Sequence, residues 1–500
     1  MKNEAQLIAY VDRTSGGTFR DLRQLLSGPL KGAFGGVHVL PFFHPIDGAD
    51  AGFDPIDHTE VDRRLGTWDD VQALAADTDV MADVIVNHVS RRSPQFEDYD
   101  ARGADSPFAG MFLTYDRVFP TGARESDLLA LYRPRPGLPF TTHRTARGEQ
   151  VLLWTTFTSE QIDIDVHHPE GKRYLANVLA RFHAAGIRAI RVDAVGYAVK
   201  KAGTTCFMIP ETFALIREFT VEAHTLGMEV LVEIHSHYQE QIAIAHHVDW
   251  VYDFALPPLV LHTLYTRDAS CLKQWVAIRP HNAVTVLDTH DGIGVVDVGA
   301  DRRGEAAGLL SPETIDRLVE TIHRRSRDGS RHATGAAANN LDLYQVNCTF
   351  YDALGRSDRE YLIARAIQCF VPGIPQIYYV GLLAGTNDLD LLRSSGIGRD
   401  INRHYNTAQE LREQLTRPVV QSLLALLRFR NSHAAFNGAF RMESSPGDRL
   451  ALVWTDGGEL ARLDVDLTAM CASVTCSSAT AGTEGERVWQ TAVVNVPDER

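Results

Sequence analysis

The sequence predicts an α/β fold: a parallel (β/α)8 TIM barrel with two insertions and a small β domain at its C-terminal end. Short apolar runs of strand length alternate with longer amphipathic runs of helical spacing over most of the chain, as in parallel sheets whose strands are joined by helices. Eight such strands can be counted, the number that closes this barrel. The 500 residues also leave room for a further domain.

The predicted elements follow one another in a regular order. The apolar runs that we interpret as strands are 6–11, 36–43, 80–87, 189–194, 228–234, 249–254, 283–287 and 376–380. The segments with helical periodicity are 18–30, 67–75, 171–184, 210–225, 360–370 and 418–431. In the third helix an apolar stripe recurs every three or four residues; it consists of Tyr174, Leu175, Val178, Leu179 and Phe182.

Two connections are too long for simple loops and predict inserted subdomains. The first, 86–167, follows the third strand and is rich in Pro, Gly, Arg and Asp; the second, 293–355, follows the seventh strand. After residue 436 the pattern changes to short alternating strands, expected over 441–454, 459–466 and 487–496, with Ser, Gly and Asp turns. We therefore predict a barrel made of residues 1–85, 168–292 and 356–436, with a C-terminal β domain at 437–500.

The composition excludes several classes of partner. A net charge of −15 opposes binding to nucleic acid or to an anionic membrane surface. The six cysteines include no C-x-x-C pair, which is typical of reduced thiols in the cytoplasm. We find neither a signal peptide nor an apolar run of bilayer length. These features predict a cytoplasmic protein without nucleic acid or membrane partners.

Polar residues stand where four predicted strands end. The third strand runs into Asn87 and His88, the fourth carries Arg191 and Asp193, the fifth leads to Glu233 and His235, and the seventh is followed by His290 and Asp291. Because the C-terminal strand ends of a TIM barrel meet at one rim and carry its chemistry, these side chains are expected to converge there.

Such a set suits the cleavage of a glycosidic bond with retention of configuration. That reaction needs one carboxylate as nucleophile and another as general acid and base, about 5 Å apart. Arg191 precedes Asp193 by two residues, so it faces the same side of the strand and favours the ionised carboxylate. Glu233 follows an apolar run, an environment that helps an acid keep its proton.

The four strand ends resemble the signatures of the α-amylase superfamily of glycoside hydrolases and transglycosidases. They lie in the same order, as Asp83–His88, Arg191–Asp193, Glu233 and His290–Asp291. The resemblance implies that Asp193 is the nucleophile, Glu233 the general acid and base, and Asp291 the transition-state stabiliser. The chain departs from many members at two positions, with Ala189 in place of Gly and Thr289 in place of Asn.

Within that superfamily, longer segments from about residue 6 to residue 431 are similar to sucrose phosphorylases. These segments are 41–43, 47–57, 132–140, 340–347 and 398–403. The resemblance implies that sucrose and inorganic phosphate are converted to α-glucose 1-phosphate and fructose through a covalent glucosyl-Asp193 intermediate, with no cofactor. The expected small-molecule partners are thus sucrose, phosphate, glucose 1-phosphate and fructose. A homodimer is expected by analogy only.

The same resemblance implies two groups of binding residues. The glucosyl pocket would comprise Asp50, Phe53, His88, Phe157, Arg191, Tyr197, His290 and Arg399. The acceptor side would comprise Tyr132, Pro134, Arg135, His235, Asp342, Leu343, Tyr344 and Gln345. Phosphate approaching several carboxylates needs a local cation, and an Arg can bind two of its oxygens at once. We expect Arg135 and Tyr344 to face phosphate, and Asp342 to face fructose.

Several alternatives stay open at this point. A related phosphorylase acting on sucrose 6′-phosphate, glucosylglycerol or glucosylglycerate would share the glucosyl pocket and differ in segments 133–137 and 341–345. A hydrolase of α-glucosides would use the same carboxylates without phosphate. A non-catalytic relative of a transporter would be expected to lack them. Asn87 occupies a position that binds calcium in many amylases, but further oxygen ligands are not evident, and we predict no metal.

Overall fold

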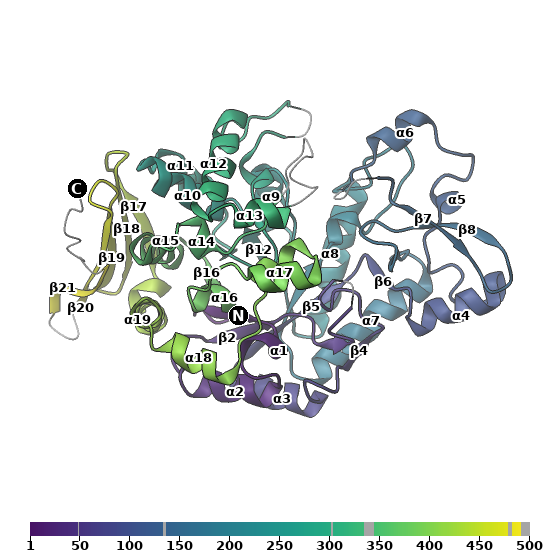
Figure 1. Cartoon of the computed structure of the whole chain (residues 1–500), viewed down its shortest axis with the longest axis horizontal. Helices are drawn as coiled ribbons and strands as arrows, with labels where there is room; N and C mark the ends of the chain where they lie inside the picture. The colour runs from purple at the N-terminus through teal and green to yellow at the C-terminus, as the bar shows by residue number, and fades with distance from the viewer. Residues whose placement is uncertain (49, 134–136, 302–303, 335–344, 479–482, 492–500) are drawn as a thin grey trace.

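The computed structural model describes residues 1–48, 50–133, 137–301, 304–334, 345–478 and 483–491. Figure 1 shows a barrel in the middle of the molecule. A lobe that carries β7 (Phe140–Arg144) and β8 (Gln150–Trp154) lies at one end of the long axis, and a C-terminal sheet lies at the other. No helix in these ranges has the length and apolar character needed to cross a bilayer.

The predicted barrel is confirmed. Eight strands close in the order β1-β16-β13-β12-β11-β10-β5-β2, with every neighbouring pair parallel. They form because β-branched and aliphatic residues dominate runs that are buried on both faces. Their bounds are β1 Gln6–Ala9, β2 Gly36–Val39, β5 Asp79–Ile85, β10 Ala189–Asp193, β11 Glu229–Val232, β12 Trp250–Asp253, β13 Ala283–Thr285 and β16 Ile374–Tyr378.

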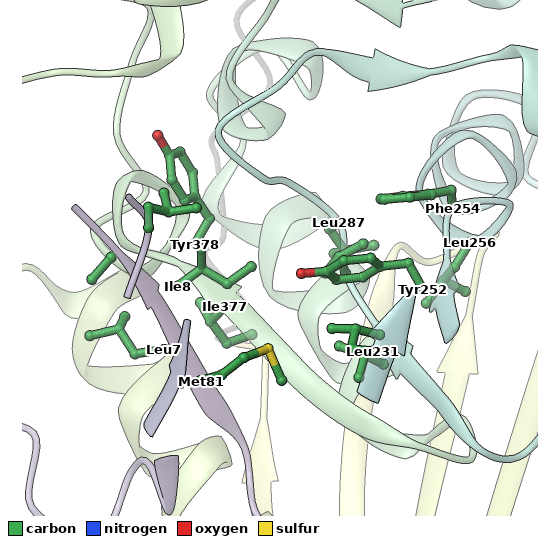
Figure 2. Close-up of a cluster of buried hydrophobic side chains, with 14 of the residues drawn as sticks. Leu7, Ile8, Met81, Leu231, Tyr252, Phe254, Leu256, Leu287, Ile377 and Tyr378 are labelled. Carbon is green, nitrogen blue, oxygen red and sulfur yellow. The ribbon is translucent and has the colours of Figure 1, made fainter. Parts of the chain in front are cut away.

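Buried side chains pack on both faces of the barrel wall. Figure 2 shows part of this core, with Leu7 and Ile8 from β1, Met81 from β5, Leu231 from β11 and Ile377 from β16. A polar ladder runs beside the apolar groups. Its members are Gln6, Gln376, Tyr252, His38 and Asp83, and each bonds to the next over 2.8–3.5 Å. The ladder leads from the barrel interior to the rim where the predicted site lies.

Helices surround the barrel and begin at recognisable caps. Pro169 and Pro210 stand in the first turn of α7 and α8, where a missing N–H costs nothing, and a capping box joins Thr67 to Asp70 at the start of α3. The helices outside the insertions are α1 Val11–Thr14, α2 Phe19–Ser27, α3 Trp68–Asp77, α7 Pro169–Ala184, α8 Pro210–Thr225, α9 Tyr238–Ala245, α10 Leu256–Thr266, α11 Ser270–Ile278, α15 Asp358–Phe370, α16 Tyr379–Leu382, α17 Leu389–Ser395, α18 Ala408–Leu415 and α19 Pro418–Ser432.

The two long connections have secondary structure of their own. Between β5 and β10 lie β6 His88–Ser90, α4 Pro94–Arg102, η1 Gly103–Asp105, α5 Tyr115–Val118, α6 Glu125–Ala130, β7, β8 and β9 Gln161–Asp163. Between β13 and β16 lie β14 Ile293–Gly294, η3 Val296–Val298, α12 Pro312–Arg325, α13 Gly329–Thr334, β15 Gln345–Val346 and α14 Phe350–Ala353. Three further short elements are β3 Phe43–His44, β4 Asp57–Val61 and η2 Val195–Tyr197. The domain limits given above stay predictions.

The C-terminal segment forms a five-stranded antiparallel sheet in sequence order. It follows η5 Gly398–Asn402 and η6 Ala434–Asn437, and its strands are β17 Ala439–Glu443, β18 Arg449–Asp456, β19 Glu459–Asp466, β20 Cys471–Ser478 and β21 Thr483–Gln490. The segment expected over 441–454 is split between β17 and β18 because Pro446 and Gly447 make a turn. β20 was missed, since its Ser, Thr and Ala residues weaken the apolar alternation.

Candidate active site

The predicted site residues converge at the C-terminal rim of the barrel. Asp193 is the last residue of β10 and Glu233 directly follows β11. Arg191 and Asp83 are paired across the sheet between β10 and β5. One potential ligand atom each of Glu233, His235 and Asp291 lies within 4.8 Å of the other two. Strand geometry thus brings together residues that are more than one hundred positions apart in sequence.

A single buried guanidinium organises the carboxylates. Arg191 donates to Asp193 over 2.7 Å and to Asp83 over 2.5 Å, and its other terminal nitrogen lies 4.0 Å from Glu233. Burial opposes ionisation of Asp83, but His38 and Arg191 outweigh it and lower the pKa of Asp83 to about 2. Asp83 therefore holds Arg191 in place, and Arg191 in turn positions Asp193 and lies near Glu233.

Asp193 and Glu233 are coupled through this arrangement. Burial raises the pKa of Asp193 well above its ordinary value against the opposing effect of Arg191, and the charges of Glu233 and Asp83 add to the rise. Because Arg191 donates to Asp193 directly and stands farther from Glu233, it stabilises the negative charge of Asp193 more strongly.

The backbone after Asp193 turns sharply. Ala194 adopts the left-handed conformation, with φ 54° and ψ 19°, which is uncommon for a residue other than glycine. The turn directs the Ala194 N–H toward Glu233, whose Oε2 accepts it over 3.4 Å. Ala194, next to the predicted nucleophile, therefore helps to orient Glu233.

Two arginines hold Asp291. Arg399 lies 2.9 Å from its Oδ1 and 3.8 Å from Asp50, and Arg403 lies 3.7 Å from the same Oδ1. Burial acts against the ionised form, but Arg399, His290 and Arg403 outweigh it and lower the pKa of Asp291. Asp291 is thus a carboxylate at any physiological pH, as stabilisation of a developing positive charge requires.

Two histidines complete the polar lining in their neutral form. Burial is the largest influence on both, and it lowers the pKa of His88 and lowers the pKa of His290 to about 3. The His88 Nε2 contacts the Phe53 carbonyl over 2.9 Å, and the ring of Phe53 stacks on His290 with centroids 4.7 Å apart. Neutral imidazoles offer hydrogen bonds to hydroxyl groups without adding charge.

Aromatic rings form the remaining wall. Phe157 makes edge contacts with His88 and with Tyr197 at centroid distances of 5.5 and 5.1 Å. Tyr132 stacks on Tyr197 at 5.6 Å. A mostly apolar wall with a few convergent polar groups is the usual form of a small-molecule site. All eight residues predicted for the glucosyl pocket therefore contact one another or the catalytic carboxylates.

The acceptor side is described in part. His235 lies 3.7 Å from Glu233, and its Nε2 is 3.1 Å from the Gln345 amide nitrogen. The predictions for Pro134, Arg135, Asp342, Leu343 and Tyr344 lie outside the described residues.

A lysine ammonium stands at the position considered for calcium. Lys200 Nζ lies 2.9 Å from Asn87 Oδ1 and 2.8 Å from Asp163 Oδ2, and it also contacts the Tyr197 carbonyl. The chain therefore supplies its own cation to these oxygens. Among the described residues, Glu233, His235 and Asp291 are the one group with metal-ligand atoms this close together, and its members have the catalytic positions argued above.

Sequence reasoning missed several residues that shape this site. Asp83 and Arg403 were read only as parts of motifs, and Lys200 and Asp163 were not singled out. Asp83 carried a usable signal, since a carboxylate in the middle of an apolar strand requires a buried partner. Asp163 ends β9 and Lys200 lies in the segment after η2, and nothing in their spacing indicates that they meet.

Comparison with known proteins agrees with this geometry. A family model described as the α-amylase catalytic domain matches residues 32–381. With its barrel and its ordered carboxylates, the chain belongs to the α-amylase family. It is 60% identical to a sucrose phosphorylase of Agrobacterium vitis, over 95% of this chain and 98% of that protein. Identity to a sucrose phosphorylase of Bifidobacterium adolescentis is 52%, over 91% and 90% of the two chains. These similarities place the chain among the sucrose phosphorylases of that family.

A solved structure extends the comparison to the whole fold. The crystal structure of sucrose 6F-phosphate phosphorylase from Thermoanaerobacter thermosaccharolyticum superposes with a TM-score of 0.89 at 37% sequence identity, covering 98% of each chain. The barrel, the insertions and the C-terminal sheet are therefore similar as a unit to those of a phosphorylase.

Proposed function

We propose that the protein is a sucrose phosphorylase, which converts sucrose and phosphate to α-glucose 1-phosphate and fructose. The observation that carries this proposal is the similarity to two sucrose phosphorylases over more than nine-tenths of the chain. The pocket supports it, because Arg399 lies 2.9 Å from Asp291 and 3.8 Å from Asp50 and so links two residues expected to enclose the glucosyl unit. Such a boundary suits a single terminal glucosyl unit better than a polysaccharide.

The geometry supports a double displacement. Asp193 attacks the anomeric carbon while Glu233 donates its proton to the departing fructose oxygen, and the Asp193–glucosyl ester forms as the glycosidic bond breaks. Phosphate then attacks the same carbon, Glu233 takes up the proton of the attacking oxygen, and Asp193 leaves. Asp291 and the carboxylate form of Asp193 favour the oxocarbenium-like charge in both steps.

We infer that the reaction needs no cofactor, with phosphate as the second substrate. A cytoplasmic location agrees with six cysteines that form no disulfide. A homodimer stays a proposal by analogy, and sedimentation equilibrium would test it.

A panel of glucosyl donors tests the choice among related activities. The enzyme would be incubated with phosphate and either sucrose, sucrose 6′-phosphate, glucosylglycerol or glucosylglycerate, and glucose 1-phosphate measured. We expect the highest kcat/KM with sucrose. A higher value for another donor would reassign the aglycone, and release of free glucose at the same rate with and without phosphate would indicate a hydrolase.

A further inference from the structure

A buried aspartate that the mechanism does not use lies behind the acceptor side. Asp297, in η3 of the second insertion, is fully buried. Its Oδ2 accepts from His235 Nδ1 over 3.0 Å, while its Oδ1 accepts from the Ser236 N–H over 3.2 Å and from Gln241 Nε2 over 2.9 Å. Its oxygens are therefore fully engaged, and one of their partners is a residue of the site.

Two contacts orient the imidazole of His235: the bond to Asp297 sets where Nδ1 points, and a stacked ring sets the plane of the imidazole. Its ring stacks on Phe254 with centroids 3.8 Å apart and an interplanar angle of 16°; Phe254 follows β12 and is labelled beside Tyr252 in Figure 2. Gly294 leaves the space that the pair needs, because a Cβ there would lie 2.6 Å from Asp297 Oδ2 and 3.1 Å from His235 Nδ1. The chain is thus built to hold His235 against Asp297.

This arrangement leaves Nε2 of His235 for the acceptor side. That atom lies 3.7 Å from Glu233 Oε1 and 3.1 Å from Gln345 Nε2. With Nδ1–H donated to Asp297, a neutral ring carries its lone pair at Nε2. The Gln345 amide then donates to Nε2, and its oxygen accepts from the Gly292 N–H over 3.3 Å.

Phosphate changes the charge balance at this position. It arrives after Glu233 has given up its proton, so it meets the carboxylates of Glu233 and Asp291. Among the described residues, the arginines near these two carboxylates already contact carboxylates. Arg191 contacts Asp83 and Asp193. Arg399 contacts Asp291 and Asp50. A proton on His235 Nε2 adds a positive charge beside the incoming phosphate, which attracts this dianion.

We propose that Asp297 is a positioning residue that fixes the His235 tautomer and allows its Nε2 to take up a proton and bind the incoming phosphate. The proposal rests on the phosphorylase activity proposed above. Protonation removes the Nε2 lone pair that accepts from the Gln345 amide, so the amide moves away and the new N–H is offered to a phosphate oxygen. His235 thereby alternates between a neutral form that suits fructose release and a cationic form that suits phosphate.

The charged groups that face His235 agree with this role. Asp297 comes from η3, Glu233 from the end of β11 and Asp291 from the segment after β13, while Phe254 packs on the ring without charge. Burial disfavours the imidazolium, but Asp297, Glu233 and Asp291 outweigh it and raise the pKa of His235. A raised pKa keeps the cation present to higher pH.

The test separates phosphate use from the rest of the reaction. Asp297→Asn keeps the shape and removes the charge. We expect kcat/KM for phosphate to fall about 10- to 100-fold, as when a partner that orients a functional histidine is lost. Sucrose hydrolysis without phosphate should change by less than about threefold, because formation of the glucosyl-enzyme does not use the cation. The alkaline limb of the phosphate kcat/KM profile should move to lower pH.

Two further variants and one control make the result decisive. Gly294→Ala should cause the same selective loss, and Asp297→Asn should have no additional effect in a His235→Gln background. Asp253→Asn removes another buried aspartate, bonded to Trp275 and Arg279, and should lower both reactions equally. Equal loss of phosphorolysis and hydrolysis in Asp297→Asn and Gly294→Ala, or an unchanged phosphate kcat/KM, would overturn the inference. Absence of phosphate-dependent activity in the wild type would instead refute the proposed function.

Discussion

Asp83 offers the sharpest test of how the barrel supports the site. It is fully buried and bonds to both His38 and Arg191. Its pKa falls from 3.8 to about 2 on folding, and each unit corresponds to about 1.4 kcal/mol. The ionised carboxylate thus contributes about 2 kcal/mol to the free energy of unfolding at neutral pH. Asp83→Asn removes this contribution and leaves the Arg191 charge less compensated.

The pH dependence gives the sign of the effect. Because the folded pKa is lowered, the stabilisation is complete above the unfolded pKa near 4 and disappears as the pH falls toward 2. Urea unfolding followed by tryptophan fluorescence should show Asp83→Asn about 2 kcal/mol less stable than wild type at pH 7, with a smaller difference at pH 3. The change should also lower kcat about 10-fold or more, since Arg191 positions the nucleophile.

An exposed pair provides the control for this experiment. Asp390 is 91% exposed and pairs with Arg393, so Asp390→Asn should change stability by less than about 0.5 kcal/mol. If Asp83→Asn were as stable as wild type at pH 7, or if the deficit stayed constant down to pH 3, the role assigned to the Asp83–Arg191 pair would be wrong.

Three further predictions concern the pocket and its support. Glu233→Gln should slow sucrose turnover far more than turnover of α-glucosyl fluoride, whose leaving group needs little protonation; similar losses in initial-rate assays would argue against Glu233 as the acid. Lys200→Met leaves Asp163 buried without its cation and should cost about 3–5 kcal/mol in urea unfolding, with partial recovery on adding Asp163→Asn. Arg399→Lys should lower kcat/KM for sucrose about 100-fold, because the lysine cannot replace the guanidinium geometry beside Asp291; a change below threefold would contradict its place in the pocket.

The sequence predicted the barrel well because parallel strands are buried on both faces and read as continuous apolar runs. β10 and α8 illustrate this, with bounds that agree with the predictions to within one residue. The C-terminal sheet was harder to predict, because β20 consists of small and polar residues whose place depends on pairing with β19. For β20, the strand assignment follows from its hydrogen-bonded register with β19 and not from its own residue pattern.

The site residues also divide into those that the sequence pattern predicts and those that depend on three-dimensional packing. Asp193 ends β10, Glu233 follows β11 and Asp291 lies in the segment after β13, so the fold class alone brings them to one rim. Asp297 and Lys200 come from connections, and their partners are fixed only when the insertions pack on the barrel. Their roles follow from three-dimensional contacts with His235 and Asn87, which sequence spacing cannot reveal.

The product ratio from sucrose in saturating phosphate distinguishes a phosphorylase from a hydrolase. Double displacement through Asp193 predicts α-glucose 1-phosphate as the main glucosyl product, formed in step with fructose, and no glucosyl-enzyme in Asp193→Ala. Free glucose as the main product, or substantial turnover by Asp193→Ala, would contradict it.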